Sequence, residues 1–315
     1  VQTTLSRVIG QIAVPIDRMA HRVVLGGPHF WQPTRITPKM QRELQALSDL
    51  APLHMPNILR AIRVATTLAP KTPQWAVFDS GLYEHLPLVA REYALPKALT
   101  TKYKIRRYGF HGASHLWAER QASRLTRRPW SGITVHLGSG SSVTVWKNGR
   151  PIDTSMGFSP LSGPMMATRS GDIDPILPLY IAQRAHLTPA QVEKLLYTKS
   201  GLLGLTGSDD IRDVLSSLGH APKDWVSTKK IPRAVAAAAY HVLTYEVAKI
   251  IGEFSSLLPK APIIVFTGTM GQNRRVQKDV LRWLPAARRW KTLTVKTQEA
   301  VAIVELLDGV LRYPK

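Results

Sequence analysis

Apolar and polar residues alternate between residues 133 and 145, and this pattern predicts two consecutive β-strands. Residues 138–142, between the apolar runs, are all Gly or Ser. An Asn-Gly pair follows at residues 148–149, and this dipeptide favours the tight type I′ turn of a hairpin. We therefore predict hairpin strands with a Gly/Ser loop at one end and a tight reversal at the other. The apolar positions are Ile133, Val135, Leu137, Val143 and Val145.

Longer apolar periodicities predict helices, and two short apolar runs predict buried strands. The run at residues 75–79 ends in the carboxylate Asp79, and the run at residues 262–267 continues into a glycine turn at 268–271. A strand followed by a glycine turn also occurs at 133–140, which fits a duplicated α/β domain. Helices are predicted over residues 36–47, 52–68, 187–196 and 234–258, and between Pro87 and Pro96.

The Gly/Ser loop is a candidate phosphate loop, because small residues let backbone N–H groups and hydroxyls approach an anion closely. An ordinary hairpin connection is the alternative. A Rossmann turn is excluded, since the third glycine position holds Val143 and a strand follows instead of a helix. A Walker loop is excluded as well, because the one lysine of this stretch, Lys147, lies beyond the loop.

Two polar segments are further candidates for a site. The segment RSGDIDP begins with Arg169 and places two carboxylates near a glycine, a set suited to an anion and its counter-charges. A helix N-cap with salt bridges is the alternative. The segment YGFHGASH predicts that His111 and His115 lie on a glycine-flanked turn, although a lone histidine is more often a hydrogen-bonded polar residue than a catalyst.

Length and composition favour a chain with two domains. The 315 residues are 44% apolar, which suffices for proper cores. The sequence has no cysteine, so disulfides and thiolate metal sites are excluded. We find no apolar run of the roughly 18 residues that a membrane span needs, and therefore predict a soluble chain with no membrane span.

The net charge is unusual for a metabolic enzyme. The 42 Lys and Arg residues exceed the 21 Asp and Glu residues, which gives +21. This excess predicts contact with RNA or a ribonucleoprotein, although each basic run alone fits a solvated helix face. An RNA-rich assembly such as an organellar ribosome would place the chain in the mitochondrial matrix and not in the cytoplasm. The candidate RNA-binding residues, predicted to form two helical faces, are Arg120, Arg124, Arg127 and Arg128, and Arg274, Arg275, Lys278 and Arg282.

Several blocks, spread in order over nearly the whole chain, resemble the acetate kinase family of the sugar-kinase, heat-shock-protein and actin superfamily. The resemblance implies a two-domain α/β fold of the actin-like ATPase type, with the first domain at residues 1–82 and 302–315 and the second at 83–301. The family usually forms a homodimer through the second domain. The blocks are HRVVLGG (21–27), LAPLHMPN (50–57), VFDSGLYEHLP (77–87), RRYGFHGASH (106–115), residues 136–175, SGLLGLTGSDDIRD (200–213) and VFTGTMGQN (265–273).

One element of the resembled family is expected to be missing. Its members open with a strand and a first phosphate loop of the N-A-G-S-S-S type, well before the HRVVLGG block. Residues 1–20 contain no such loop, and the chain begins at Val1. We therefore expect that this part was removed or lost, that the first domain lacks its N-terminal strands, and that nucleotide binding depends on the remaining turns.

The resemblance assigns chemical roles to matching residues. It implies that Arg22 and Arg169 hold acetate and the transferring phosphoryl group. Asp79 matches the carboxylate that aligns or activates the acceptor, and His111 matches the histidine that donates to the phosphoryl oxygens. The remaining matches are two supporting histidines and a glutamate that holds Mg²⁺ through water, namely His54, His136 and Glu299.

Three segments match the family's contacts to ATP or ADP, namely a second phosphate loop, residues beside adenine and an adenosine turn. This sequence departs from the family pattern at Ser139, where asparagine is usual, at Thr269, where glycine is usual, and at Gln272, where glutamate is usual. The matching residues are Gly138, Ser139 and Gly140, then Asp210, Ile211 and Arg212, then Gly268, Gly271 and Asn273.

Two functions therefore compete. The first is ATP-dependent phosphoryl transfer to acetate or a similar carboxylate, giving ADP and acetyl phosphate, with Mg²⁺ as the cofactor. The alternative is a kinase-derived, inactive structural subunit of an RNA-rich assembly, such as a mitochondrial ribosome or its assembly intermediate. The retained site residues favour the enzyme, whereas the charge and the missing segment favour the structural protein.

Overall fold

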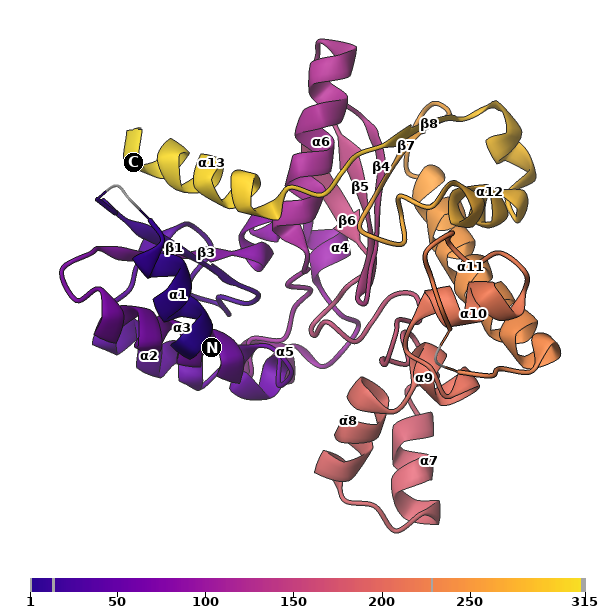
Figure 1. Ribbon diagram of the computed structural model, residues 1–315, viewed down its shortest axis with the longest axis horizontal. Coiled ribbons are helices and arrows are strands. Elements are labelled where there is room, and N and C mark those ends of the chain that lie inside the picture. The colour runs from indigo at the N-terminus through magenta and orange to yellow at the C-terminus, as the bar shows by residue number, and fades with distance from the viewer. Residues whose placement is uncertain (1, 13–14, 228, 313–315) are drawn as a thin grey trace. The chain divides into compact units, whose positions relative to one another are not determined.

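The computed structural model describes residues 2–12, 15–227 and 229–312, which form two compact units (Figure 1). Unit 1 comprises residues 1–117, 158–160 and 298–315. Unit 2 comprises residues 118–157 and 161–297. These bounds differ from the predicted domain bounds at residues 82 and 302. Residues 83–117 belong to unit 1, where the Tyr83 hydroxyl donates to the Phe110 carbonyl at 3.1 Å.

Unit 1 contains a three-stranded sheet of order β1-β3-β2. Strand β1 lies parallel to β3, whereas β2 lies antiparallel to it. The strands are β1 (Met19–Val23), β2 (Thr34–Arg35) and β3 (Gln74–Phe78). The α-helices are α1 (Gln2–Gly10), α2 (Pro38–Gln45), α3 (Met55–Leu68), α4 (Leu88–Arg91), α5 (Lys97–Lys102), the first part of α6 (Gly112–Thr126) and α13 (Glu299–Arg312). Short 3₁₀ turns cover Ser48–Leu50 and Asp79–Tyr83.

The core of unit 1 forms where α2 and α3 pack together against the sheet. Helix α3 buries Met55 and Leu59, and α2 buries Met40 and Leu44, in one cluster with Phe78 of β3. The helical spacing of these residues is what the apolar periodicity predicted. Both helices begin later than predicted, because a proline occupies the first turn of each, where its missing N–H does no harm.

Unit 2 contains a five-stranded mixed sheet of order β6-β5-β4-β7-β8. Neighbours β4–β5 and β5–β6 are antiparallel, and β4–β7 and β7–β8 are parallel. The strands are β4 (Gly132–Leu137), β5 (Ser141–Lys147), β6 (Arg150–Thr154), β7 (Ile263–Thr267) and β8 (Lys291–Thr294). The helices are α7 (Leu177–Arg184), α8 (Pro189–Thr198), α9 (Gly201–Thr206), α10 (Ile211–Ser217), α11 (Arg233–Ser255) and α12 (Arg274–Arg282), with a 3₁₀ turn at Pro285–Arg289.

The predicted hairpins are confirmed. Strands β4 and β5 form an antiparallel pair joined by the Gly/Ser loop, and β5 and β6 form an antiparallel pair joined by the tight turn at residues 148–149. Asn148 and Gly149 have φ angles of 52° and 74°, as a type I′ turn requires at both central positions. The strand predicted at 262–267 is β7, which lies between β4 and β8. Two loops, after β4 and after β7, therefore lie at the same edge of the sheet.

Helix α11 corrects the prediction that no segment could span a membrane. By length and composition its 23 residues could cross a bilayer. Half of its most apolar window is buried, however, and residues such as Leu243, Val247 and Ile251 pack in one core with Val135 of β4 and Val145 of β5. This packing is that of a core helix, which passes the same test of length and composition.

Two predictions about local structure were wrong. Helix α6 ends at Thr126 and Arg127 has a left-handed φ of 54°, so Arg127 and Arg128 do not share a helical face with Arg120 and Arg124. His115 lies within α6, fully buried, and not on a turn. By contrast, the helix predicted between Pro87 and Pro96 is confirmed as the short helix α4, Leu88–Arg91. Helix α12 carries all four of its predicted basic residues, and all are exposed.

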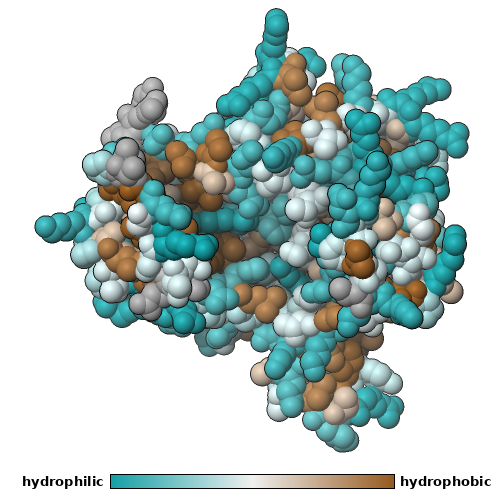
Figure 2. All heavy atoms as spheres, in the orientation of Figure 1, coloured by the Kyte–Doolittle hydropathy of each residue, from teal (hydrophilic) through white to brown (hydrophobic). Residues whose placement is uncertain are grey.

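The α7–α8 hairpin exposes apolar side chains. Figure 2 shows apolar surface on this hairpin. Ile176, Leu179 and Tyr180 are more than half exposed. None of the residues of α7 is buried. The family resemblance also predicts a homodimer. The exposed side chains of this hairpin do not test that prediction, which stays open.

Candidate active site

In unit 1, two parallel strands bring Arg22 and Asp79 together. Arg22 lies opposite Val77 in the register of β1 and β3, and Asp79 follows Val77 by two residues. Side chains at matched register and at i+2 share a face of the sheet, so the guanidinium reaches the carboxylate. The Arg22 Nε atom donates to Asp79 Oδ1 at 3.2 Å, and Nη2 donates to Asp79 Oδ2 at 2.7 Å. This is the two-pronged geometry that guanidinium and carboxylate groups favour.

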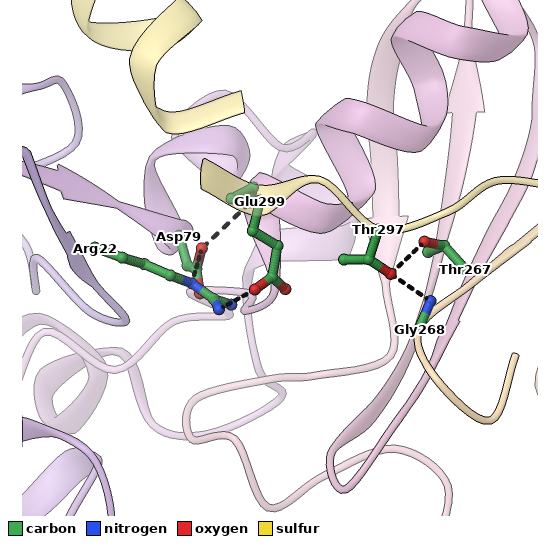
Figure 3. A network of polar contacts seen from close by, with 7 residues as sticks. Arg22, Asp79, Thr267, Gly268, Thr297 and Glu299 are labelled. Carbon is green, nitrogen blue, oxygen red and sulfur yellow. Dashed lines mark hydrogen bonds and ion pairs between the residues drawn. The ribbon is translucent and has the colours of Figure 1, made fainter. Parts of the chain in front are cut away.

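Helix α13 brings Glu299 to the same guanidinium. Ala302, Ile303 and Leu307 of this helix pack against Val77, on the face of the sheet that carries Arg22. The Arg22 Nη1 atom therefore donates to Glu299 Oε2 at 2.6 Å (Figure 3). One cation thus lies between two carboxylates that are distant in sequence.

Burial and charge shift the ionisation of this cluster. Burial alone would lower the pKa of the Arg22 guanidinium, but the charges of Asp79 and Glu299, and hydrogen bonds to Asp79, raise it above its ordinary value. Burial raises the pKa of Glu299, Arg22 opposes that shift, and Asp79 reinforces it. The cluster therefore contains a permanent cation and one carboxylate that takes up a proton more readily than usual.

The start of α6 holds the other side of Asp79. The Ala113 N–H donates to Asp79 Oδ1 at 3.2 Å. A Cβ atom on Gly112 would lie only 1.9 Å from the Asp79 carbonyl oxygen, so this close approach requires glycine. His111 has a left-handed φ of 56° and lies immediately before this turn. The YGFHG segment thus places His111 beside the strand end that carries Asp79, whereas His54 lies at the N-terminus of α3.

We predict a pH-dependent effect of Glu299→Gln. In the folded chain Glu299 holds its proton to higher pH than in the unfolded chain, because its pKa is raised. Its contribution to the free energy of unfolding therefore falls as pH rises from the ordinary glutamate pKa through the raised value. Denaturant titrations from about pH 4 to about pH 7 should show the wild type losing stability relative to Glu299→Gln. The exposed Glu193→Gln is the control, and a difference from the wild type that stays constant with pH would contradict the prediction.

In unit 2, the glycine turn after β7 is fixed to the end of β4. The Leu137 carbonyl accepts hydrogen bonds from the Met270 and Gly271 N–H groups, both at 3.0 Å. A Cβ atom on Gly268 would lie 2.3 Å from the same carbonyl oxygen. Thr297 completes the turn, because its hydroxyl accepts from the Gly268 N–H at 2.9 Å (Figure 3). Gly268 and Gly271 therefore permit close backbone approach.

A pocket of about 440 Å³ opens beside these two loops. Six predicted nucleotide-binding residues line it, together with apolar side chains such as Leu202, Leu215 and Val276. The predicted residues are Gly138, Ser139, Asp210, Ile211, Arg212 and Asn273. Thr269 and Met270 of the predicted glycine turn also line the pocket. The sequence interpretation missed six further lining residues, namely Ala167, Leu202, Asp209, Leu215, Pro222 and Val276.

Three predicted residues do not line the pocket, namely Gly140, Gly268 and Gly271. Gly140 is buried, and its carbonyl accepts from the Gly138 N–H at 2.9 Å, so this N–H group is used within the loop. Asn273 lines the pocket, but its side-chain oxygen caps α12 by accepting from the Arg275 and Val276 N–H groups. Close backbone packing and helix capping explain these positions without a ligand.

Helix α10 forms one wall of the pocket, and an ion pair and a cation–π contact hold this wall in place. Asp210 caps α10 by accepting from the Arg212 N–H at 2.9 Å, and the Arg212 guanidinium returns to the same carboxylate at 2.6 Å. The hydrogen bond from Arg212 lowers the pKa of Asp210. The guanidinium also lies 3.6 Å from the centre of the Trp225 ring. Arg212 therefore links α10 to the 222–227 segment.

Asp213 is a positioning residue that the sequence interpretation missed. It is 2% exposed, and its carboxylate accepts from Ser208 Oγ at 2.7 Å, Trp225 Nε1 at 3.0 Å and Ser227 Oγ at 2.9 Å. These contacts fasten the segment that contributes Pro222 to the pocket. No periodic pattern marks such a residue, because its partners lie on both sides of α10.

Replacing Asp213 with Ala should loosen this wall. Three donors would lose a buried carboxylate, so we expect a loss of stability on the order of 3 kcal/mol and weaker binding of adenine nucleotide. Thermal unfolding and ADP calorimetry measure the two effects. The exposed Asp224→Ala in the same segment should change neither. Equal ADP affinity in all three proteins would contradict the assigned role.

The loop carrying Arg169 packs tightly in unit 2. Arg169 is 6% exposed, and burial lowers its pKa while Tyr197 partly opposes the shift. The Met166 N–H donates to the Arg169 carbonyl at 3.1 Å. The Ala167 N–H donates to the Ser139 carbonyl at 3.1 Å, which ties this loop to the Gly/Ser loop. A Cβ atom on Gly138 would lie 3.4 Å from His136 Nε2, so this histidine also borders the Gly/Ser loop.

The predicted residues thus form two groups within the described chain. Unit 1 brings Arg22, Asp79 and Glu299 into contact, with His111 at the adjoining turn. Unit 2 gathers the nucleotide-binding candidates around one pocket, and the backbone of the Arg169 loop is tied to that pocket's Gly/Ser loop.

Known proteins with similar sequences are acetate kinases. A family model described as the acetokinase family matches residues 1–301. An acetate kinase of Helicobacter acinonychis is 41% identical over 82% of this chain and 62% of its own length. One of Dictyoglomus thermophilum is 39% identical over 84% of this chain and 65% of its own length. The chain therefore spans less than two thirds of these relatives.

Solved structures agree with the sequence matches. A propionate kinase from Francisella tularensis has a TM-score of 0.83 and 31% identity, with 91% of this chain and 78% of that chain covered. An acetate kinase from Entamoeba histolytica has a TM-score of 0.84 and 26% identity, with 99% and 86% covered. The fold is thus the α/β acetate kinase fold of the actin-like ATPases, as the sequence predicted, and the chain belongs to the acetokinase family.

Proposed function

We propose that the chain transfers the γ-phosphoryl group of ATP to acetate or a similar short carboxylate. A carboxylate oxygen attacks the γ-phosphorus, the bond to the ADP oxygen breaks, and ADP leaves with the electron pair. The observation that carries this proposal is the Arg22 cation held between Asp79 and Glu299. Family membership supports the same reaction.

Arg22 is proposed to bind the acceptor carboxylate by charge-assisted hydrogen bonds. Its guanidinium is 30% exposed and fixed by Asp79, so it is pre-oriented for an anion. Asp79 is 1% exposed and serves chiefly to orient this cation. Arg169 is proposed to stabilise negative charge on the transferring phosphoryl group, where a buried cation is most effective. His111 is proposed to donate to the same oxygens.

The pocket of unit 2 is proposed to bind ATP and ADP. Its apolar lining suits adenine, and the lining residues Asp210 and Arg212 can bind polar groups of the nucleotide. Gly138 and Ser139 provide a narrow backbone approach for the phosphates. Because the Gly138 N–H is bonded within the loop, Ser139 is the better candidate for a phosphate contact.

The Glu299 carboxylate fits a magnesium ion that binds through water. Among the described residues, no group of three or more His, Cys, Asp and Glu side chains could hold a metal by itself. Mg²⁺ normally binds one or two carboxylates, several waters and substrate phosphates, a set to which Glu299, with a side chain that is 27% exposed, can contribute. When bound, Mg²⁺ would offset charge on the phosphates of ATP.

The substrate class can be tested with hydroxylamine, which traps acyl phosphates. Incubation with ATP, Mg²⁺ and either acetate, propionate or butyrate should give hydroxamate, with acetate or propionate preferred over butyrate. Reactions without ATP or without carboxylate are the blanks. Hydroxamate formation that does not depend on the carboxylate would contradict the proposal.

The net charge of +21 favours a second candidate function, binding to RNA in a mitochondrial ribonucleoprotein. The exposed residues Arg124, Arg127 and Arg128 lie at and beyond the end of α6. Binding to structured RNA should weaken by roughly a thousandfold between about 50 and 200 mM salt, because neutralised phosphates release counterions.

A filter-binding titration tests this candidate. Replacing Arg120, Arg124, Arg127 and Arg128 with Gln should flatten the salt dependence. The control is a second protein in which four exposed lysines far apart in sequence, Lys39, Lys71, Lys147 and Lys260, are changed to Gln. Binding that is undetectable, or insensitive to salt, would exclude the RNA role.

A further inference from the structure

Unit 2 contains a second pocket, of about 250 Å³, that shares no lining residue with the nucleotide pocket. It lies where the end of α10, the first half of α11 and α12 meet. The lining is rich in guanidinium and imidazole groups, and its one carboxylate is Asp279. The lining residues that matter here are Arg233, Arg275, Arg282, His220, His241, Asp279 and Trp283.

Asp279 pairs with only two of the three arginines that line the pocket. It is 7% exposed, and its Oδ2 atom accepts from Arg275 Nε at 2.5 Å and from the Tyr240 hydroxyl at 3.0 Å. Arg282 Nη2 lies 3.6 Å from Asp279 Oδ1, which is an ion pair but too long for a hydrogen bond. Arg233 has no acidic partner within ion-pair distance in the described part of the chain. Two guanidinium groups thus share one carboxylate, and the third, that of Arg233, has none.

This excess of cations in a concave site favours an anion. The pocket has a net charge of +2 from its arginines and Asp279, before any protonation of His220 or His241. Low-dielectric walls focus such a field, and mutual repulsion of the guanidinium groups is relieved when an anion binds between them. Two arginines can each donate in two-pronged fashion to phosphate oxygens.

Trp283 supplies a flat wall beside these cations. Its side chain is held in place, since Nε1 donates to Thr244 Oγ1 at 3.1 Å and the ring meets Tyr245 edge-on at 5.4 Å. The residue is still 45% exposed. An indole fixed in this way reports on a bound ligand through its fluorescence.

We propose that this pocket binds a small phosphorylated anion, of the size of a pyrophosphate group or a sugar phosphate, at a site separate from the nucleotide pocket. The size of the pocket excludes a folded macromolecule, although a nucleic-acid phosphate offers the same chemistry. The site is independent of the proposed kinase reaction, since none of its lining residues belongs to the acceptor cluster or to the nucleotide pocket.

The test compares two double variants that each remove two positive charges from unit 2. Arg233→Gln with Arg282→Gln removes two cations that line the pocket. Arg274→Gln with Lys278→Gln removes two exposed cations of α12 that do not line it. Arg275 is kept in both, because its loss would leave Asp279 buried without its closest cation. Both variants leave the nucleotide pocket unchanged, so any phosphate bound there contributes equally.

Calorimetry with pyrophosphate at constant ionic strength should show wild-type affinity in the Arg274/Lys278 variant and at least about tenfold weaker binding in the Arg233/Arg282 variant. Thermal unfolding verifies that each variant folds, and the single Arg233→Gln replaces the double if it does not. The part of the pyrophosphate-induced change in fluorescence that depends on Arg233 and Arg282 should disappear in Trp283→Phe. Equal weakening in both double variants, or no binding by any protein, would overturn the proposal.

A single-stranded oligonucleotide provides the second arm. If the pocket binds small phosphorylated anions, pyrophosphate affinity depends on Arg233 and Arg282 whereas oligonucleotide affinity falls equally in both double variants. If only oligonucleotide binding depends on these two arginines, the pocket is a nucleic-acid contact and the proposal is wrong.

Discussion

Replacing Arg22 with Ala is expected to lower turnover in the hydroxamate assay by at least about a hundredfold, the usual cost of removing a preorganised donor from a site where charge develops. The same change removes the cation that pairs with Asp79, a side chain only 1% exposed. We expect a loss of stability of about 3 kcal/mol, the lower end for a buried pair, because the Arg22 side chain is 30% exposed.

The charge-conserving Arg22→Lys separates the two effects. Lysine can keep an ion pair with Asp79 but cannot reproduce the two-pronged contact to Asp79 together with the one to Glu299. It should therefore recover most of the stability and little of the turnover. Arg18→Ala is the matched control, because Arg18 is 45% exposed and forms only a 3.6 Å pair with Asp308. Equal turnover in wild type and Arg22→Ala would show that this cluster is not used in catalysis.

Replacing Arg169 with Ala should lower turnover by a similar factor, roughly a hundredfold or more, through a different step. Arg169 is proposed to interact with the transferring phosphoryl group, so the loss should appear in kcat more than in the KM for the carboxylate. The backbone hydrogen bonds of its loop do not depend on the side chain, and we expect the fold to persist.

The control for Arg169 is Arg150→Ala, an exposed arginine on β6 of the same unit. Both proteins should unfold at temperatures close to that of the wild type, and only Arg169→Ala should lose activity. A higher KM for the carboxylate with an unchanged kcat would contradict the assigned role. Equal rates for all three proteins would show that the inherited site is not used.

Local signals in the sequence predicted the elements that depend on local physics. Asn148-Gly149 predicted a type I′ turn because few other dipeptides adopt left-handed φ angles at both positions. The apolar run at 262–267 predicted β7, and the run at 75–79 predicted that Asp79 follows a strand. Residue identity at these positions strongly favours one backbone conformation.

The end of α6 shows where periodicity fails. The spacing of the arginines predicted one helical face that extends to Arg128. Helix α6 instead ends at Thr126, and the chain turns at Arg127, which has a left-handed φ, before it continues into Pro129 and Trp130. The N–H of buried Trp130 is bonded to the Ser123 hydroxyl, a tertiary contact that competes with continued helix. The basic residues carry no signal that distinguishes a helix from the turn after it.

Most residues of the candidate site were predicted from the resemblance to a family. The contacts that hold these residues in place were not predicted. Arg22, Asp79 and Glu299 were named separately, but their contact depends on strand register and on the packing of α13 against Val77. Asp213 was missed because its donors come from segments on both sides of α10. Such contacts between distant segments require the tertiary structure.

Phosphoryl transfer by this chain is tested most directly by ³¹P NMR of the purified protein with ATP, acetate and Mg²⁺. We expect the ATP signals to decay while ADP and acetyl phosphate appear in equal amounts, and we expect no acetyl phosphate when acetate is omitted. ATP that stays intact, or that gives ADP and inorganic phosphate without acetyl phosphate when acetate is present, would contradict the proposal that this chain is a carboxylate kinase.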